Sequence, residues 1–256
     1  MNAKLKEAAS TVMSEATPSY PQQGARVVSA SKRNLLPNGR LIKDGVLLFV
    51  HAHPDDETSS TGATMAAYAR EGAKVHLLTL TRGEMGEVIP EDLKHLQVGD
   101  PECTDNGEAL GEYRTGELVA ASRTLGVASR FYLGQAPATA TGTRKIYRDS
   151  GMVWGEDGKP APNPKASSDS LTAEPIEPQA QAIANAIRSI KPDALITYDA
   201  DGGYGHPDHV RTHQAVMQAL SLLKSSQKPV LVWGIEGEFD ETDKRTQAAI
   251  YGSTTA

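Results

Sequence analysis

The sequence is poor in several features that define particular classes of protein. Only one of its 256 residues is a cysteine, Cys103, so no disulfide can form within the chain. No run of 18 apolar residues occurs, and a transmembrane helix is therefore not expected. Residues 1–30 lack the apolar core of a secretion signal. From these absences we predict a cytoplasmic protein that does not associate with a membrane.

Basic residues are neither in excess nor clustered. The chain has 26 lysines and arginines against 32 aspartates and glutamates, a formal net charge of -6. Nucleic-acid binding depends mainly on clustered cations that release counterions from the phosphates, so nucleic acid is not an expected partner. The hydrophobic content of 39% is typical of a globular protein. The sequence does not indicate an oligomeric state.

Apolar runs alternate with helical patterns from residue 46 onward. Residues 46–50 (VLLFV) form the kind of continuous apolar run that a parallel strand buried on both faces has. Further strands are predicted at 75–80, 130–134, 194–198 and 230–233, and helices at 62–70, 113–125, 179–190 and 209–223. This alternation predicts an α/β fold, a single-domain Rossmann-like sheet that is mostly parallel and has helices on both faces.

Two segments depart from this pattern. Residues 1–44 are rich in serine, alanine, proline and glycine, and we predict a partly disordered N-terminal arm ahead of a domain at residues 45–256. Residues 153–178 carry several prolines together with serines and aspartates. Prolines at this density favour a surface loop inserted into the domain.

Two polar motifs follow predicted strands. Residues 51–57 (HAHPDDE) come directly after the first strand, and residues 202–209 (GGYGHPDH) come shortly after the strand at 194–198. Ligands in parallel α/β sheets bind at the carboxyl ends of the strands, which lie along one edge. We therefore expect the two motifs to meet at that edge, although they are far apart in the chain.

Together the motifs offer the side chains of a catalytic metal site. Two histidines and a carboxylate suit Zn²⁺ with a fourth coordination position left open. Such an ion lowers the pKa of bound water and polarises a substrate carbonyl. Amide hydrolysis then needs a general base, for which Asp55 is a candidate, and a proton donor, for which His206 is a candidate with Asp208 to orient it.

Other interpretations of the same residues stay open. A His-Pro-Asp turn can simply be the capped start of a helix, with proline at the first helical position. His53 and Asp55 with a distant histidine also imitate the two-histidine, one-carboxylate set of non-haem iron oxygenases. Those enzymes usually carry that set on an antiparallel jelly roll, which the alternating pattern disfavours.

The two motifs resemble those of the PIG-L/LmbE family of zinc-dependent N-acetylglucosamine de-N-acetylases. The similarity covers most of residues 46–235, and residues 81–88, 111–118 and 148–152 support it. Within the family it is greatest to the actinobacterial deacetylases of mycothiol synthesis, which act on N-acetylglucosaminyl-inositol. The resemblance implies metal-dependent hydrolysis of the N-acetyl group of such a small amino-sugar substrate.

The resemblance also implies roles for individual residues. The zinc ligands would be His53, Asp56 and His209. The residues acting in catalysis would be Asp55 as general base, His206 as acid or electrostatic stabiliser, and Tyr204 assisting the tetrahedral intermediate. The residues holding sugar or inositol hydroxyls would be Glu87, Arg114 and Asp149, with Met152 packing nearby. Fe²⁺ is a possible alternative to zinc, since it accepts the same ligands.

A sister enzyme is the main alternative within the family. The amidase that cleaves mycothiol conjugates has a lysine soon after its HPDDE motif, whereas residues 57–62 (ETSSTG) contain none. This difference favours the deacetylase. A homologue that binds metal or sugar without catalysis is a further alternative. Of the other histidines, neither His213, one turn after His209, nor His51 is expected to bind the ion.

Overall fold

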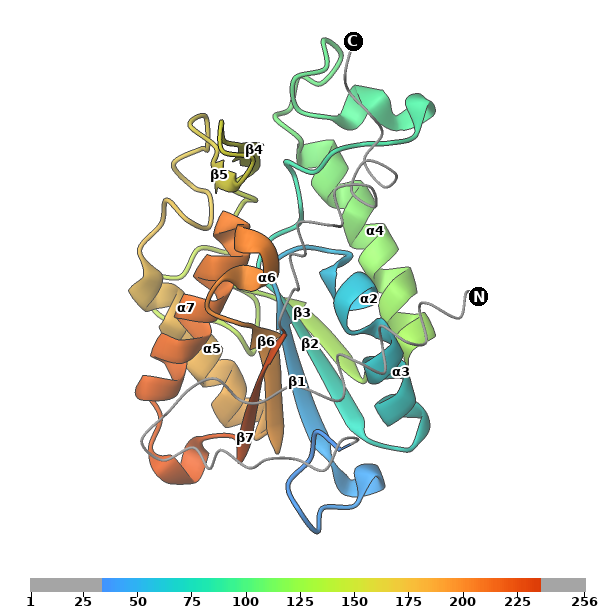
Figure 1. Cartoon of the computed structure of the whole chain (residues 1–256), viewed down its shortest axis with the longest axis vertical. Coiled ribbons are helices and arrows are strands. Elements are labelled where there is room, and N and C mark those ends of the chain that lie inside the picture. Colours follow the sequence, from blue (N-terminus) through green and yellow to red (C-terminus); the bar gives the residue numbers. More distant parts are fainter. Residues whose placement is uncertain (1–33, 236–256) are drawn as a thin grey trace.

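The computed structural model describes residues 34–235 and confirms the predicted α/β fold (Figure 1). Its main sheet has five parallel strands in the order β3-β2-β1-β6-β7. The strands are β1 (Val46–His51), β2 (Lys74–Thr79), β3 (Ser129–Tyr132), β6 (Ala194–Tyr198) and β7 (Leu231–Ile235). The strand order reverses between β1 and β6, and ligands bind beyond the strand ends at such a reversal. Residues 1–33 of the predicted arm lie outside the described residues.

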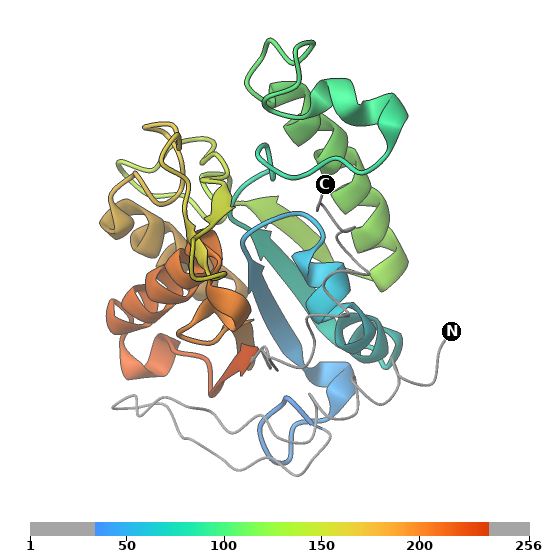
Figure 2. The ribbon, with the colours of Figure 1, turned by 45° about the horizontal axis from the view of Figure 1, so that its top comes forward.

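Helices cover both faces of the sheet, as the sequence predicts (Figures 1 and 2). One face carries α5 (Ile176–Ile190) and α7 (Pro207–Ser221), and the other carries α2 (Asp56–Ser60), α3 (Gly62–Arg70) and α4 (Glu108–Leu125). The shorter helical segments are η1 (Ile42–Asp44), η2 (Glu91–Leu96), α6 (Gly202–Gly205) and η3 (Ser225–Gln227). None of the helices within residues 34–235 combines the length and apolar character needed to cross a membrane.

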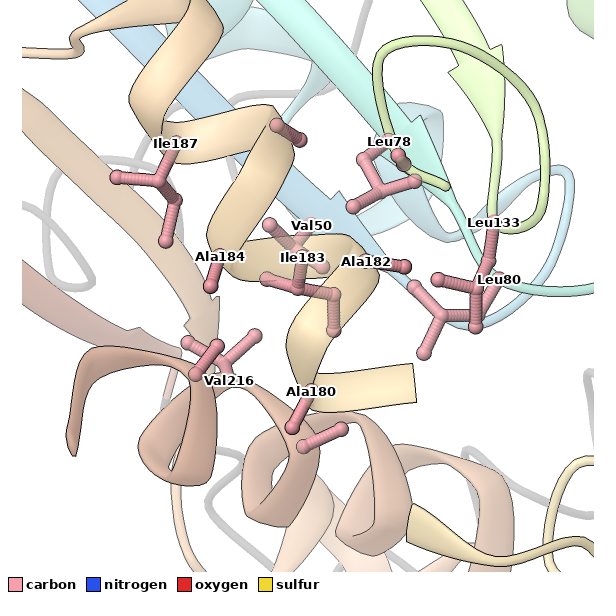
Figure 3. Close-up of a cluster of buried hydrophobic side chains, with 14 of the residues drawn as sticks. Val50, Leu78, Leu80, Leu133, Ala180, Ala182, Ile183, Ala184, Ile187 and Val216 are labelled. Atoms are coloured by element: carbon pink, nitrogen blue, oxygen red, sulfur yellow. The ribbon is translucent and has the colours of Figure 1, made fainter. Parts of the chain in front are cut away.

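The central strand β1 sends alternate side chains into two hydrophobic clusters. Leu48 and Val50 belong to the cluster that also contains Ile183 of α5 and Val216 of α7. Figure 3 labels Val50 together with these two residues. Leu47 and Phe49 point to the other face, toward α3 and α4. All four β1 side chains are fully buried. The continuous apolar run therefore reflects burial on both faces, which anchors the carboxyl end of β1 in a fixed position.

Helix α4 starts earlier than the sequence pattern indicates. We predicted a helix from residue 113, but α4 begins at Glu108. The turn before it explains the difference, because the Asp105 carboxylate accepts hydrogen bonds from the backbone N–H groups of Gly107 and Ala109. Gly107 has a φ of 83°, which glycine adopts readily. The cap thus adds more than a turn of helix to the predicted element.

The segment predicted as a loop at residues 153–178 holds two short strands. β4 (Met152–Trp154) and β5 (Pro160–Pro162) pair antiparallel. The connecting turn uses Gly158 at a φ of 72°, and the N–H of Gly155 donates to the carbonyl of Lys159 at 2.8 Å. α5 also begins inside this segment, at Ile176, because a proline at residue 178 is tolerated in the first turn of a helix. The segment predicted as a surface loop insertion thus contains one short hairpin and the start of α5.

Candidate active site

The two polar motifs lie side by side at the carboxyl end of the sheet. Residues 51–57 follow β1, and residues 202–209 follow β6, its neighbour in the sheet. The ring centroids of His53 and His209 are 5.3 Å apart, and those of His53 and His206 are 4.8 Å apart. The reversal of strand order thus brings together residues that are distant in the chain, as we expected from the parallel pattern.

Asp56 lies between the two histidines that the sequence assigns to the metal. One carboxylate oxygen, Oδ1, is 3.4 Å from Nε2 of His209, and the other, Oδ2, is 3.3 Å from Nδ1 of His53. All three residues are buried. Each histidine therefore presents one ring nitrogen to the carboxylate of Asp56.

The hydrogen bonds of His209 leave Nε2 as the free ligand atom. Its Nδ1 is 3.1 Å from the carbonyl oxygen of Gly202, and a carbonyl can only accept, so Nδ1 carries the proton. Nε2 is buried and has no hydrogen-bond partner among residues 34–235. In a neutral His209 this atom carries a lone pair that faces the Asp56 carboxylate across 3.4 Å, and a cation beside both atoms would satisfy the pair. The donor set therefore fits a metal ion such as Zn²⁺.

The carboxylate of Asp208 contacts His53, whereas its backbone N–H contacts His206, the histidine that we expected it to orient. Oδ2 of Asp208 lies 3.1 Å from Nε2 of His53 and accepts from the N–H of Ser150 at 2.9 Å. The proline before it starts helix α7, and this turn directs the carboxylate inward, where it is fully buried. With Nε2 of His53 bound in this way, Nδ1 is left to face Asp56.

His206 is fixed as a neutral hydrogen-bond donor. Its Nδ1 accepts from the backbone N–H of Asp208 at 3.1 Å, so the ring caps helix α7. Burial, together with the neighbouring rings of His53 and His209, lowers the pKa of His206 to about 3. The proton of the neutral ring is therefore on Nε2. The three histidine rings lie close enough to share an ion, but His206 would lose its capping bond if Nε2 became a ligand.

Asp55 occupies a strained position at the wall of the site. Its φ is 106°, a value that non-glycine residues rarely adopt. The Arg114 guanidinium donates to Oδ2 of Asp55 at 2.6 Å and to the carbonyl oxygens of Gly83 and Pro54. Desolvation raises the pKa of Asp55 to about 6, and the charge of Arg114 opposes this change. Because 69% of the side chain is exposed, water still reaches the carboxylate.

A cavity of about 720 Å³ extends outward from these residues. It is lined by the predicted metal ligands, by Asp55 and His206, and by all four predicted substrate contacts, Glu87, Arg114, Asp149 and Met152. Asp208 is fully buried and does not line it. The Asp149 carboxylate is already engaged, since it accepts from the N–H groups of Gly151 and Met85 and lies 3.6 Å from His53. Asp149 is thus buried and already hydrogen-bonded, whereas a group that binds a substrate hydroxyl would be open to the cavity.

Tyr204 stands at the rim of the cavity. Its ring is edge-on to His209 at 5.2 Å and to His206 at 6.1 Å, and 38% of the residue is exposed. It lies in the short helix α6 between two glycines with positive φ, Gly203 and Gly205. This turn carries the tyrosine above the histidines.

One residue that the motifs did not indicate contacts the candidate metal ligands. Tyr198, the last residue of β6, donates a hydrogen bond from its hydroxyl to Asp56 at 2.7 Å. Its position at the end of the strand before the second motif was the available signal. His213 donates from Nδ1 to the carbonyl of Tyr198 at 2.9 Å, and His51 pairs with Thr61 at 3.0 Å. Neither histidine belongs to a group of described residues that could hold a metal.

Comparison with known proteins identifies close relatives. The family described as GlcNAc-PI de-N-acetylase, PIG-L, matches residues 48–220. A 1D-myo-inositol 2-acetamido-2-deoxy-alpha-D-glucopyranoside deacetylase of Kineococcus radiotolerans is 50% identical over 183 residues, which are 72% of this chain and 46% of the relative. The enzyme of the same name from Streptomyces avermitilis is 45% identical over 181 residues, 71% of this chain and 54% of the relative.

Among solved structures, the N,N'-diacetylchitobiose deacetylase of Pyrococcus horikoshii aligns with a TM-score of 0.47 and 21% identity, covering 71% of this chain and 52% of that one. This chain spans about half the length of the curated relatives that it matches. The family match covers more than half of the chain and includes both polar motifs. The chain therefore belongs to the PIG-L family of GlcNAc-PI de-N-acetylases.

Proposed function

We propose that this chain hydrolyses the N-acetyl group of an N-acetylglucosaminide, with N-acetylglucosaminyl-inositol as the substrate. The main observation behind the proposal is the buried set formed by His53, Asp56 and His209, which faces a cavity that also contains Asp55. The names of the two relatives favour this substrate over a mycothiol conjugate.

A metal ion fits the three ligand residues, and we infer Zn²⁺, with Fe²⁺ as the alternative. When bound, such an ion polarises the amide carbonyl and increases the acidity of water. His53 and His209 are both oriented for this purpose by partners on their other ring nitrogens, Asp208 and Gly202. Partners of this kind fix the tautomer and direction of a ligand histidine.

The remaining steps belong to residues of the cavity. A water molecule attacks the acetyl carbonyl, and Asp55 accepts the proton that this water gives up. His206 donates a hydrogen bond from Nε2 to the carbonyl oxygen as negative charge develops there. Tyr204 is placed at the rim to donate in the same way. The C–N bond then breaks, the amine nitrogen receives the proton, and acetate leaves.

Arg114 keeps Asp55 in place for this reaction. Its guanidinium holds the carboxylate and the carbonyl of the preceding residue, Pro54, at the same time. Glu87 and Met152 line the outer part of the cavity, where the sugar and the inositol ring would lie. We propose that substrate hydroxyls donate hydrogen bonds to the Glu87 carboxylate and accept hydrogen bonds from N–H groups of Arg114.

An assay for free amine tests this function. We expect the zinc-loaded protein to release fluorescamine-reactive amine from N-acetylglucosaminyl-inositol, and a chelator to abolish the reaction. Asp55→Ala should retain zinc but lose turnover by about 100-fold to 10,000-fold, since a positioned base contributes that much. Zinc-loaded protein that releases no amine above background would reject the enzyme in favour of a binding protein. Unchanged turnover in Asp55→Ala would reject the base.

A further inference from the structure

Tyr198 forms a hydrogen-bond relay whose direction is fixed by its chemistry. The residue is buried at the carboxyl end of β6, and its hydroxyl oxygen lies 2.9 Å from the backbone nitrogen of Ala52 and 2.7 Å from Oδ2 of Asp56. The N–H of Ala52 can only donate, so the hydroxyl oxygen accepts from it. The hydroxyl proton therefore points to the Asp56 carboxylate.

This relay decides which oxygen of Asp56 remains available. Oδ2 accepts from Tyr198 and also from the backbone N–H of His53 at 2.9 Å. Two donors at these distances hold the carboxylate in one rotation. The other oxygen, Oδ1, is left 3.4 Å from Nε2 of His209.

The ring of Tyr198 acts on the second ligand residue. It stacks on the imidazole of His209 with centroids 4.2 Å apart and an interplanar angle of 8°. The carbonyl of Gly202 already fixes the Nδ1 side of that imidazole. The stacking contact and the hydrogen bond at Nδ1 together fix the orientation of the His209 ring. In this orientation Nε2 points to Asp56.

We propose that Tyr198 is a positioning residue of the metal site. Its hydroxyl holds Asp56 and its ring holds His209, so that Oδ1 and Nε2 are directed at one point. The inference rests on the proposed metal-dependent function and adds to it a residue that does not touch the ion. Partners of ligand residues typically contribute about 10-fold to 100-fold to metal affinity.

Tyr198→Phe removes the hydroxyl and keeps the ring. Zinc affinity is measured by competition with a chromophoric chelator, and the stability of the metal-free protein by thermal unfolding. Tyr68→Phe is the matched control, because the buried Tyr68 hydroxyl also accepts from a backbone N–H, that of Leu35, and donates to an oxygen, Oδ1 of Asn34. It lies on α3, away from the candidate site.

We expect zinc affinity to fall by about 10-fold to 100-fold in Tyr198→Phe and to stay unchanged in Tyr68→Phe. Equal affinity in wild type and Tyr198→Phe would overturn the inference and leave the proposed function intact. An equal loss in both variants would also overturn it, since the effect would then come from general destabilisation. A wild-type protein that binds no zinc would overturn the proposed function, and this inference with it.

Discussion

At the scale of single residues, the clearest departure from ordinary geometry is Asp55. A φ of 106° is costly for any residue with a Cβ atom, yet the sequence places aspartate there rather than glycine. Strained residues of this kind persist where the surroundings impose the conformation, and they gather at functional sites. A glycine would relieve the strain at this position but would lack the carboxylate, which Arg114 holds at the cavity wall.

A pair of substitutions separates the strain from the side chain. Asp55→Ala and Asp55→Gly both remove the carboxylate and its ion pair, but only glycine relieves the positive φ. We expect the glycine variant to be the more stable of the two by on the order of 1 kcal/mol, after the entropy cost of glycine in the unfolded chain. Urea denaturation measures the difference. An alanine variant as stable as the glycine variant would show that the backbone is not strained.

Single residues also set the limit of what the sequence predicts about the site. The parallel strand pattern predicted that the two motifs would meet at one edge, and the family resemblance implied His53, Asp56 and His209 as the ligands within them. The contact between the Asp208 carboxylate and His53 was not predicted, since the direction of this side chain depends on the geometry of one turn, while the backbone N–H of Asp208 contacts His206. Such directions follow from packing and not from the sequence pattern.

At the scale of elements, helix α4 contains one glycine that lowers its stability and another that its C-terminal cap requires. Gly116 lies at an exposed position within the helix, with no atom within 4 Å of a Cβ placed there. Gly126 ends the same helix with a φ of 74° and donates to the carbonyls of Arg123 and Ser122. Added methyl groups should therefore have opposite effects at these two positions.

We expect Gly116→Ala to stabilise the protein by about 0.5–1 kcal/mol, because alanine is the better helix former. Gly126→Ala should destabilise it by about 1–2 kcal/mol, because alanine resists the left-handed conformation. Its Cβ would also lie 2.9 Å from that of Ala69. Thermal or urea unfolding of the two variants checks both signs. Two changes of the same sign would contradict this account of α4.

The sequence predicted best those elements whose apolar pattern is compatible with only one type of secondary structure. The run at residues 46–50 became β1 because both faces of the central strand are buried. The β4–β5 hairpin was missed because its prolines suggested a loop, whereas proline is tolerated in short edge strands. Asp157-Gly158 was the turn signal that could have predicted it.

At the scale of the whole molecule, the candidate metal site joins two halves of the sheet. His53 and Asp56 follow β1, while His209 is on α7 after β6, so an ion held by all three connects the two sides of the strand-order reversal. A ligand that binds only the folded state stabilises it by mass action. The stability of the protein should therefore depend on the concentration of zinc.

We expect free zinc at 100 times its dissociation constant to stabilise the folded protein by about 2.7 kcal/mol, measured as a rise in the unfolding temperature that grows with zinc concentration. His209→Ala should lose most of this gain, because it removes the ligand from the second half. Asp55→Ala should keep it. A second group, His53, Asp149 and Asp208, could also hold a cation in the described part of the chain. If His209→Ala keeps the full stabilisation, the ion binds at that group, and the two motifs do not share it.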